Sequence, residues 1–381
     1  MIIDSVEYKG KNVTLDTVHF QKNNVLVGAS GAGKTTIINS IQRIIDISNG
    51  ESFAGASWKL SLRDDDGHIA IWEGQFSKKE IFLDEVDDDS KKAYRVERES
   101  LTYKGKEIFK RSEGSSQFLE NKLPESSPNI SLMSNYKSDQ NVHAIQSAIS
   151  KIRIITTSDT DTTDSEAIPV INTTLQKLVK EFYNENPKAK IRELSEAYNV
   201  ESRALLYFAK KYDKESFEDV EFEFTNIFPF IRKISLRNHT YITDKNESRE
   251  YFFIELITDT GKVIQQGDIS SGMFKTLNIL STIYLSASKS TILIDEVENS
   301  LGVNCLPDIL NELYSANQQV IFSSHHPKII NKSPTMSWLV VTRQDQNVMV
   351  HKASELGIDK GNHDPFTKLI NHHIYNDGVN S

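Results

Sequence analysis

A glycine-rich segment of eight residues constrains this chain more than any other feature of its sequence. Residues 28–35 read Gly-Ala-Ser-Gly-Ala-Gly-Lys-Thr, which matches the pattern G-x-x-x-x-G-K-[ST] at every required position. Residues 24–27 before it are typical of a short buried strand, and isoleucines recur at helical spacing over 35–45 after it. The alternative is an ordinary glycine-rich turn between a strand and a helix. We predict a strand, a phosphate-binding loop and a helix in that order.

The chemistry of such a loop follows from its residue types. Glycines let backbone N–H groups turn inward around a phosphate, and the N-terminus of the following helix favours negative charge. Lys34 is expected to reach the β- and γ-phosphates, and the hydroxyl of Thr35 is expected to bind Mg²⁺. ATP and Mg²⁺ are therefore the expected cofactors. The residues of this segment expected to bind the nucleotide are Gly28, Ala29, Ser30, Gly31, Ala32, Gly33, Lys34, Thr35 and Thr36.

A second motif, far along the chain, ends an apolar strand with two carboxylates. Residues 292–296 read Ile-Leu-Ile-Asp-Glu. Asp295 at the strand end is expected to hold the Mg²⁺, and Glu296 to orient and deprotonate the attacking water. The alternative is an acidic loop that merely caps a strand. Glu298, close by, is interpreted as a structural or interfacial residue.

Composition restricts the function classes. The chain has 381 residues and a single cysteine, Cys305, which favours a reducing, cytoplasmic location. No apolar run approaches the length of a membrane span, and the first residues lack a secretory signal, so we expect no membrane partner. The net charge of −9 argues against a protein that coats nucleic acid through bulk charge, although a basic patch formed on assembly stays open.

The remaining segments indicate how the chain is organised. Residues 56–110 alternate with period two, as antiparallel strands do, and the polar stretch 158–166 is typical of a linker. The acidic runs 64–66 and 87–89 are interpreted as solvated loops, and the histidines 363, 372 and 373 as surface residues, rather than as metal ligands. Helical spacing then appears in 171–182, 191–198 and 202–212, and strand patterns in 252–264, 291–294, 320–322 and 337–352.

A serine-rich helix start sits shortly before the acidic strand. Residues 269–273 read Ile-Ser-Ser-Gly-Met and open a segment with apolar residues at helical spacing; alone, this pattern indicates only a helix cap. Its place between the two motifs makes the chain resemble the ATP-binding-cassette ATPases, in the branch of SMC-like heads, RecF-like proteins and OLD-type ATPase domains. Ile269 stands where that signature has leucine. Ser270, Ser271 and Gly272 fit its serine-rich form, and Met273 departs from it.

The resemblance implies roles for further residues. Ser270 and Gly272 would contact the γ-phosphate bound to the other subunit of a head-to-tail dimer. His325, in the sequence Phe-Ser-Ser-His-His-Pro after a strand, would be the switch histidine that contacts the γ-phosphate, with His326 as the less favoured neighbour. Residues 298–301 occupy the place of the D-loop. Gln140 is our candidate for the glutamine that joins the metal site, and Tyr8 is one option for the adenine contact.

The resemblance also implies the fold. We expect an α/β fold: an ABC-type P-loop ATPase head with a mixed or parallel core sheet, an antiparallel β-subdomain and an inserted helical lobe. The expected segments are 1–155 with the phosphate loop and β-subdomain, 156–230 as the helical insertion or lid, and 231–381 with the signature, acidic strand, switch histidine and tail. The insertion and the tail are the expected partner or sensor surfaces.

The leading functional hypothesis is an ATPase that dimerises on ATP and controls an effector. Compact members of this branch resemble the ATPase components of bacterial anti-phage systems such as Septu and PARIS. The segment after 352 has no cluster of carboxylates like that of a Toprim nuclease, so the effector, a nuclease or toxin, is expected to be a separate chain. DNA or a phage product is the expected trigger. The alternatives are a RecF- or SMC-like DNA-binding repair ATPase, and a nucleotide-dependent scaffold with negligible turnover; a transporter subunit fits least.

Overall fold

The chain folds into two units, each with its own sheet and helices. The computed structural model describes residues 1–81, 93–112, 117–118, 121–122, 128–133, 140–156, 170–242, 248–302, 304–358, 364–376 and 379–380. Its packing divides the chain into unit 1, residues 1–154 with 321–381, and unit 2, residues 155–320. The sequence segments 87–89 and 158–166, and His363, lie outside the described residues. The three segments expected from the sequence, 1–155, 156–230 and 231–381, stay a prediction.

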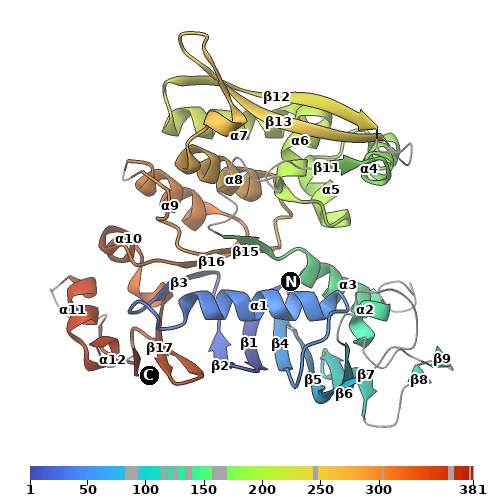
Figure 1. Ribbon diagram of the computed structural model, residues 1–381, viewed down its shortest axis with the longest axis vertical. Coiled ribbons are helices and arrows are strands. Elements are labelled where there is room, and N and C mark those ends of the chain that lie inside the picture. The colour runs from blue at the N-terminus through green and yellow to red at the C-terminus, as the bar shows by residue number, and fades with distance from the viewer. Residues whose placement is uncertain are drawn as a thin grey trace. The chain divides into compact units, whose positions relative to one another are not determined.

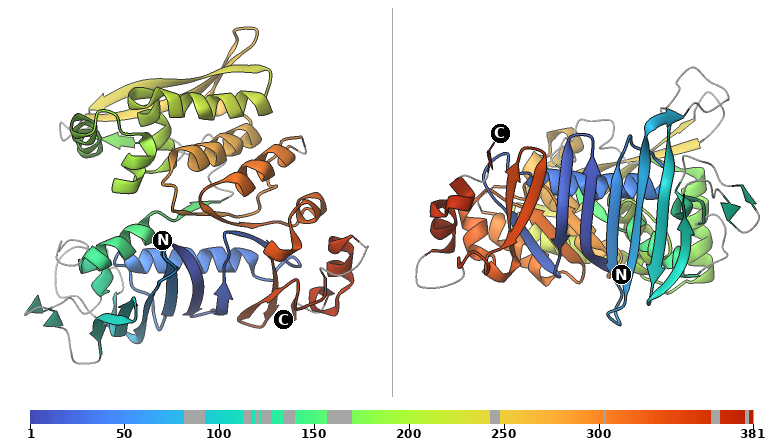
Figure 2. Two further views of the ribbon diagram at one scale, coloured as in Figure 1. Left: turned by 180° about the vertical axis from the view of Figure 1, so that it is seen from behind. Right: turned by 90° about the horizontal axis from the view of Figure 1, so that it is seen from below.

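Unit 1 is built on a mixed sheet. Its strands lie in the order β16-β3-β17-β18-β2-β1-β4-β5-β6-β7, and both β3–β17 and β18–β2 are parallel pairs. From β2 to β7 every neighbouring pair is antiparallel. The bounds are β1 (Ile2–Gly10), β2 (Val13–His19), β3 (Asn23–Val27), β4 (Ser57–Arg63), β5 (Ile69–Ile81), β6 (Ala93–Tyr103), β7 (Lys106–Arg111), β16 (Gln319–Ser323), β17 (Trp338–Gln344) and β18 (Asn347–Lys352). Figure 2 (right) shows this sheet face-on, with α1 behind it.

Helix α1 (Lys34–Ser48) covers one face of that sheet, over β1 and β2 (Figure 1). Its isoleucines at positions 37, 38, 41, 44 and 47 are buried, because helical spacing puts them all on the face toward the strands. The remaining elements of unit 1 are β8 (Gln117–Phe118), β9 (Asn121–Lys122), α2 (Asn129–Met133), α3 (Gln140–Ser150), α10 (Pro327–Lys332), the 3₁₀ turn Thr335–Ser337, α11 (Pro365–Asn371), α12 (His373–Asn376) and β19 (Val379–Asn380). β10 (Arg153–Ile155) joins the two units along the chain.

Unit 2 surrounds one long helix with shorter ones. α8 (Ser271–Leu285) packs against α5 (Ile191–Ala197), α6 (Ser202–Tyr212), α7 (Lys214–Ile227) and α9 (Leu306–Ser315). An antiparallel sheet in the order β11-β13-β12, with β14 on β13, lies beside these helices. The other bounds are β11 (Val170–Asn172), α4 (Thr173–Glu185), β12 (Ile231–Ile242), β13 (Ser248–Thr258), β14 (Val263–Gln265), the 3₁₀ turn Gln266–Asp268 and β15 (Thr291–Ile294).

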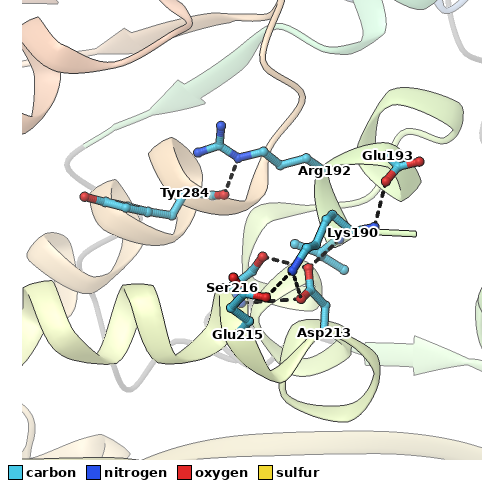
Figure 3. Close-up of polar contacts among 8 residues, drawn as sticks. Lys190, Arg192, Glu193, Asp213, Glu215, Ser216 and Tyr284 are labelled. Carbon is cyan, nitrogen blue, oxygen red and sulfur yellow. Dashed lines mark hydrogen bonds and ion pairs between the residues drawn. The ribbon is translucent and has the colours of Figure 1, made fainter. Parts of the chain in front are cut away.

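Polar contacts fasten the short helices of unit 2 to the C-terminal end of α8 (Figure 3). Arg192 on α5 donates hydrogen bonds to the backbone oxygens of Tyr284 (2.6 Å) and Ile283 (3.1 Å). Asp213 accepts from the backbone N–H of Ile191 and from the hydroxyl of Ser216, so it ties the start of α5 to the start of α7. Helices α5, α6 and α7 are therefore part of the packing around α8.

The fold-class prediction is confirmed: the chain is α/β, with a mixed sheet, antiparallel strands and a helical region. The pattern in 337–352 forms the β17–β18 hairpin, which turns at Asp345. Asp64 lies in the turn between β4 and β5, where it accepts hydrogen bonds from Tyr103 Oη and the backbone N–H of His68. Helix α7 and strand β12 went unpredicted. In the described part of the chain, no helix is long and apolar enough to cross a membrane.

Candidate nucleotide-binding site

The phosphate-binding loop lies in unit 1 between β3 and α1. Residues 24–27 are buried, and the loop begins where this strand ends. Lys34, only 4% exposed, donates hydrogen bonds to the backbone oxygens of Gly28 (2.8 Å) and Ala29 (2.9 Å). Its ammonium group therefore lies inside the curve of the loop. Thr35, in the first turn of α1, is exposed, so its hydroxyl is accessible at the positive end of the helix dipole.

Two positions of the loop require glycine, because atoms of the neighbouring strands lie where a side chain would begin. A Cβ on Gly28 would lie 2.5 Å from the backbone oxygen of Val341 in β17. Gly33 has a φ of +104°, and a Cβ there would lie 2.8 Å from Cγ2 of Val348 in β18. The two strands of the final hairpin thus press against the loop, and only glycine leaves room at both positions.

The expected switch histidine also belongs to unit 1. The backbone N–H of Ser324, directly before His325, donates a 3.2 Å hydrogen bond to the backbone oxygen of Leu26 in β3. This contact puts the end of β16 beside the strand that leads into the phosphate loop. His326 instead caps α10, because its Nδ1 accepts a hydrogen bond from the backbone N–H of Lys328. The preference for His325 over His326 stays a prediction, and the capping role of His326 agrees with it.

The acidic pair lies in unit 2, directly after the fully buried strand β15. Asp295 is 8% exposed, and its backbone N–H donates a 3.0 Å hydrogen bond to the oxygen of Ile155. Glu296 is half-buried and has a left-handed backbone with φ of +45°, which is uncommon for a residue with a side chain. The chain therefore turns sharply at Glu296, and the following residues fold back in a tight turn closed by a 2.9 Å bond from Asn299 N to Glu296 O.

The serine-rich segment caps α8, as the sequence pattern indicates. The hydroxyl oxygen of Ser270 accepts a 3.3 Å hydrogen bond from the backbone N–H of Met273, and Ser270 itself is exposed. A Cβ on Gly272 would lie 2.4 Å from the backbone oxygen of Ser300. The start of α8 and the turn after Glu296 are thus in direct contact within unit 2.

A cavity of about 480 Å³ opens in unit 1 beside the first turns of α1. Arg43 lies over the ring of Phe53 at 4.8 Å from its centroid, and burial raises the pKa of Tyr8. The cavity is lined by Tyr8, Gly10, Lys11, Val13, Thr36, Asn39, Ser40, Arg43, Ser52, Phe53, Ala54, Ala56 and Tyr94. It combines flat aromatic rings and polar groups one residue beyond Thr35, which is the chemistry that a nucleobase requires.

The structure groups the expected site residues by unit. Unit 1 holds the phosphate loop, His325 and Gln140, and unit 2 holds Ser270, Gly272, Asp295 and Glu296. Gln140 is the exposed first residue of α3, and its role at the metal site stays a prediction. Sequence reasoning missed Lys275, which is fully buried on α8 beside the acidic turn. A lysine in an otherwise largely apolar helix was the signal that could have revealed it.

Comparison with solved structures finds heads of SMC proteins. An SMC head bound to the C-terminal winged-helix domain of ScpA is 14% identical, with a TM-score of 0.49, over 92% of this chain and 98% of that one. The SMC head of Thermotoga maritima is 9% identical with a TM-score of 0.42, over 92% and 99%. That of Pyrococcus yayanosii is 11% identical with a TM-score of 0.43, over 92% and 97%.

No protein of curated function matches the sequence. Residues 24–331 match the protein family described as "AAA domain, putative AbiEii toxin, Type IV TA system". The matched range runs from the strand before the phosphate loop, through the capped helix and the acidic turn, to the helix after the expected switch histidine. The resemblance to P-loop ATPases is thereby confirmed, and this chain belongs to that family of AAA-domain ATPases.

Proposed function

We propose that this chain binds Mg-ATP, hydrolyses it and dimerises head to tail in the ATP-bound state. The conformation of the phosphate loop is the observation that carries the proposal. The buried ammonium of Lys34 is held inside the loop by two backbone oxygens, at 2.8 and 2.9 Å. A phosphate oxygen is a stronger partner for an ammonium group than a neutral carbonyl is, so a bound nucleotide would replace these contacts. Membership of an ATPase family supports the same conclusion.

The metal would be held by hard oxygen donors. The exposed hydroxyl of Thr35 and the carboxylate of Asp295 are of the type that Mg²⁺ prefers, and Gln140 is the candidate for a further oxygen ligand. When bound, Mg²⁺ neutralises charge on the β- and γ-phosphates. The residues of the chain then supply positioning: Lys34 binds the same phosphates, and His325 contacts the γ-phosphate.

Glu296 is the proposed general base. Its carboxylate accepts a proton from water as the water oxygen bonds to the γ-phosphorus, and the bond from that phosphorus to the bridging oxygen breaks. The products are ADP and inorganic phosphate. The half-buried side chain of Glu296 is accessible for this role, since it follows a sharp turn at the end of β15.

Ser270 and Gly272 of the facing copy are proposed to complete each site. Within the described residues the Ser270 oxygen accepts a hydrogen bond from Met273 N–H, and that bond leaves its hydroxyl proton available for a phosphate oxygen. The positive end of the α8 dipole lies at the same position. Two-fold symmetry would make the two sites identical. We place the adenine ring in the cavity beside Thr36, with Tyr8, Phe53 and Tyr94 as the stacking candidates.

Nucleotide binding is tested by calorimetry with Mg-ATP on the wild type and on Lys34→Ala. We expect binding by the wild type and a loss of at least about a hundredfold in affinity for the variant, because the ammonium near the phosphates is removed. Equal affinities would exclude the phosphate loop as the site. Lys328→Ala, an exposed lysine of the same unit, is the matched control and should bind like the wild type.

Head-to-tail dimerisation is tested by mixing two inactive variants. Lys34→Ala keeps its α8 start and Ser270→Arg keeps its phosphate loop, so mixed dimers rebuild one intact site. Equal amounts should restore up to about a quarter of the wild-type sites by pairing statistics on a two-fold dimer. ATP-dependent dimerisation is measured alongside hydrolysis, and Ser315→Arg, at an exposed serine of unit 2, is the control. Normal hydrolysis and dimerisation by Ser270→Arg alone would contradict the role of Ser270.

We further propose that the ATPase controls a separate nuclease or toxin in anti-phage defence. The family description, which names a toxin and a toxin–antitoxin system, supports this role. The outer face of the helical region is the proposed partner surface, since Phe222 on α7 is 62% exposed.

Phe222→Glu should retain ATP turnover and lose protection against phage in cells that carry the neighbouring genes. Met336→Glu, at a methionine of unit 1 that is 77% exposed, is the control. Full protection by Phe222→Glu would exclude this surface, and salt-sensitive, ATP-dependent retention on double-stranded DNA would favour the repair ATPase.

A further inference from the structure

Lys275 is a fully buried lysine on the helix that Ser270 caps. Its exposed fraction is 0%, and its neighbours along α8 include the buried Phe274 and Leu277. Removing an ammonium group from water is costly unless strong hydrogen bonds compensate for it. An apolar residue would fill this position without that cost, so the contacts of the ammonium group indicate what the lysine is for.

The Lys275 ammonium holds the backbone of the acidic turn. Nζ donates hydrogen bonds to the backbone oxygens of Glu296 (2.7 Å) and Asn299 (3.0 Å), which lie 21 and 24 residues further along the chain. These two oxygens are the first and last of the tight turn that follows β15. One side chain of α8 thus closes this turn from outside, in addition to the turn's own bond from Asn299 N to Glu296 O.

The turn needs such a restraint because the backbone is strained at its first residue and at the residue directly after its last. Glu296 has a φ of +45° and Ser300 a φ of +64°, and a left-handed backbone is unfavourable for a residue with a side chain. The bond from Lys275 fixes the carbonyl of Glu296, and the position of that carbonyl sets ψ of the same residue. With φ and ψ both set, the direction of the Glu296 Cα–Cβ bond is set too.

From these contacts we infer that Lys275 is a positioning residue for Glu296: it holds the Glu296 peptide so that the carboxylate is directed at the attacking water. The inference rests on the proposed function, in which Glu296 is the general base. It also links two motifs, because the helix that begins at Ser270 then restrains the base in its own chain. The contact between Gly272 and the backbone oxygen of Ser300 joins the same helix to the same turn a second time.

The test is a double-mutant cycle on ATP hydrolysis with Lys275→Met and Glu296→Ala. Lys275→Met should lower kcat by at least about thirtyfold and leave KM for Mg-ATP within about threefold, because positioning affects the transition state and not ground-state binding. In the Glu296→Ala background the same substitution should lower the residual rate by less than about twofold, since the group it positions is already gone.

The control is Thr276→Val, a nearly isosteric change at the adjacent buried residue, whose hydroxyl has no hydrogen-bond partner among the described residues. It should keep kcat within about twofold of the wild type. If Lys275→Met does not fold, Lys275→Gln takes its place in the cycle. Its shorter amide cannot hold both oxygens, so the amide protons of Asn299 and Leu301 should exchange at least about tenfold faster, with those of α9 unchanged.

The outcomes separate the inference from the proposed function. A wild-type protein that does not hydrolyse Mg-ATP overturns both. An active wild type with kcat unchanged in the Lys275 variant overturns the inference alone. An equal loss in the wild-type and Glu296→Ala backgrounds also overturns it, because Lys275 would then act independently of Glu296.

Discussion

The phosphate loop of unit 1 and the acidic turn of unit 2 are held by contacts of different range. Lys34 bonds to backbone oxygens only five and six residues before it, so the loop is closed by its own residues. The turn at Glu296 is closed by Lys275, 21 residues earlier on another element. The side-chain bonds that close the loop are thus local, although the β17–β18 hairpin also packs against it, whereas the turn combines its own bond from Asn299 N to Glu296 O with a contact from the packed helix α8.

This difference implies that the two motifs fail in different ways. A substitution inside α8, beyond Ser270 and Gly272, is expected to displace the carboxylate of Glu296, the proposed general base, and to leave phosphate binding by the loop intact. A substitution beside the loop is expected to affect binding first. Affinity and turnover therefore report on separate regions, and each of the following variants is assigned to one of them.

Glu296→Gln has the largest expected effect, and it is confined to the turn. The amide keeps the shape of the side chain and loses the base, so turnover should fall by about 10²- to 10⁴-fold while affinity for Mg-ATP is unchanged. Phosphate release and calorimetry measure the two quantities. Asp308→Asn, an exposed carboxylate of the same unit, is the control. Turnover within about threefold of the wild type would remove Glu296 from catalysis.

A pair of glycine substitutions compares the two regions directly. In Gly28→Ala the new Cβ meets the backbone oxygen of Val341, and in Gly272→Ala it meets that of Ser300. Each should cost about 1–3 kcal/mol of unfolding free energy, because backbone atoms must move. Gly28→Ala should in addition weaken ATP binding, and Gly272→Ala should in addition lower turnover, because it disturbs the start of α8 and the backbone at Ser300.

The control for this pair is Gly267→Ala, where a Cβ would meet nothing within 4 Å. Denaturant unfolding, calorimetry and phosphate release are measured on all three. The comparison fails if Gly28→Ala and Gly272→Ala change affinity and turnover in the same proportion.

Glu99 gives unit 1 a long-range polar contact outside the loop. This buried carboxylate accepts hydrogen bonds from Trp72 Nε1 and the backbone N–H of Asn129, and burial raises its pKa to about 7. The folded state therefore keeps the proton that the unfolded state loses near pH 4.5, so this group makes stability fall as pH rises between those values.

Glu99→Gln should remove that dependence. At about 1.4 kcal/mol per pH unit, the unfolding free energy of the variant relative to wild type should rise by roughly 3 kcal/mol from pH 4.5 to 7.5. Urea unfolding across this range measures it, with Glu97→Gln on the same strand as the control. Affinity for ATP should not change, and a constant difference in stability across the range would contradict the prediction.

Arg192→Met has the smallest expected effect. It removes the hydrogen bond to the backbone oxygen of Tyr284 (Figure 3) and the one to that of Ile283, and we expect a loss of about 1–2 kcal/mol in the unfolding free energy. The ATP affinity should stay the same, because the loop lies in the other unit. Arg232→Met, at an exposed arginine of β12, should cost less than about 0.5 kcal/mol. Equal losses for the two arginines would show that the α8 end is not held by Arg192.

Sequence patterns predicted the local elements well. The loop 28–35, the buried strand before the acidic pair and the hairpin that turns at Asp345 all follow from consecutive residues. Strand β12 was not predicted, because its sequence from Ile231 to Ile242 mixes charged and polar residues and lacks the regular apolar alternation of a half-buried strand. Helix α7 was not predicted, because its acidic residues are interleaved with the apolar residues that it buries against α8.

The sequence by itself determined the phosphate loop, because its geometry depends on glycines, a lysine and a threonine that are adjacent in the chain. Only the tertiary structure decided that the helical region belongs to the packing of α8, that Tyr8 borders a cavity beside Thr36, and that Lys275 holds the peptide of Glu296. Each of these depends on which distant segments meet in the folded chain. Residue types do not show which backbone oxygens a side chain will meet, so the sequence shows Lys275 as a lysine in a largely apolar helix and only the fold shows what its ammonium group binds.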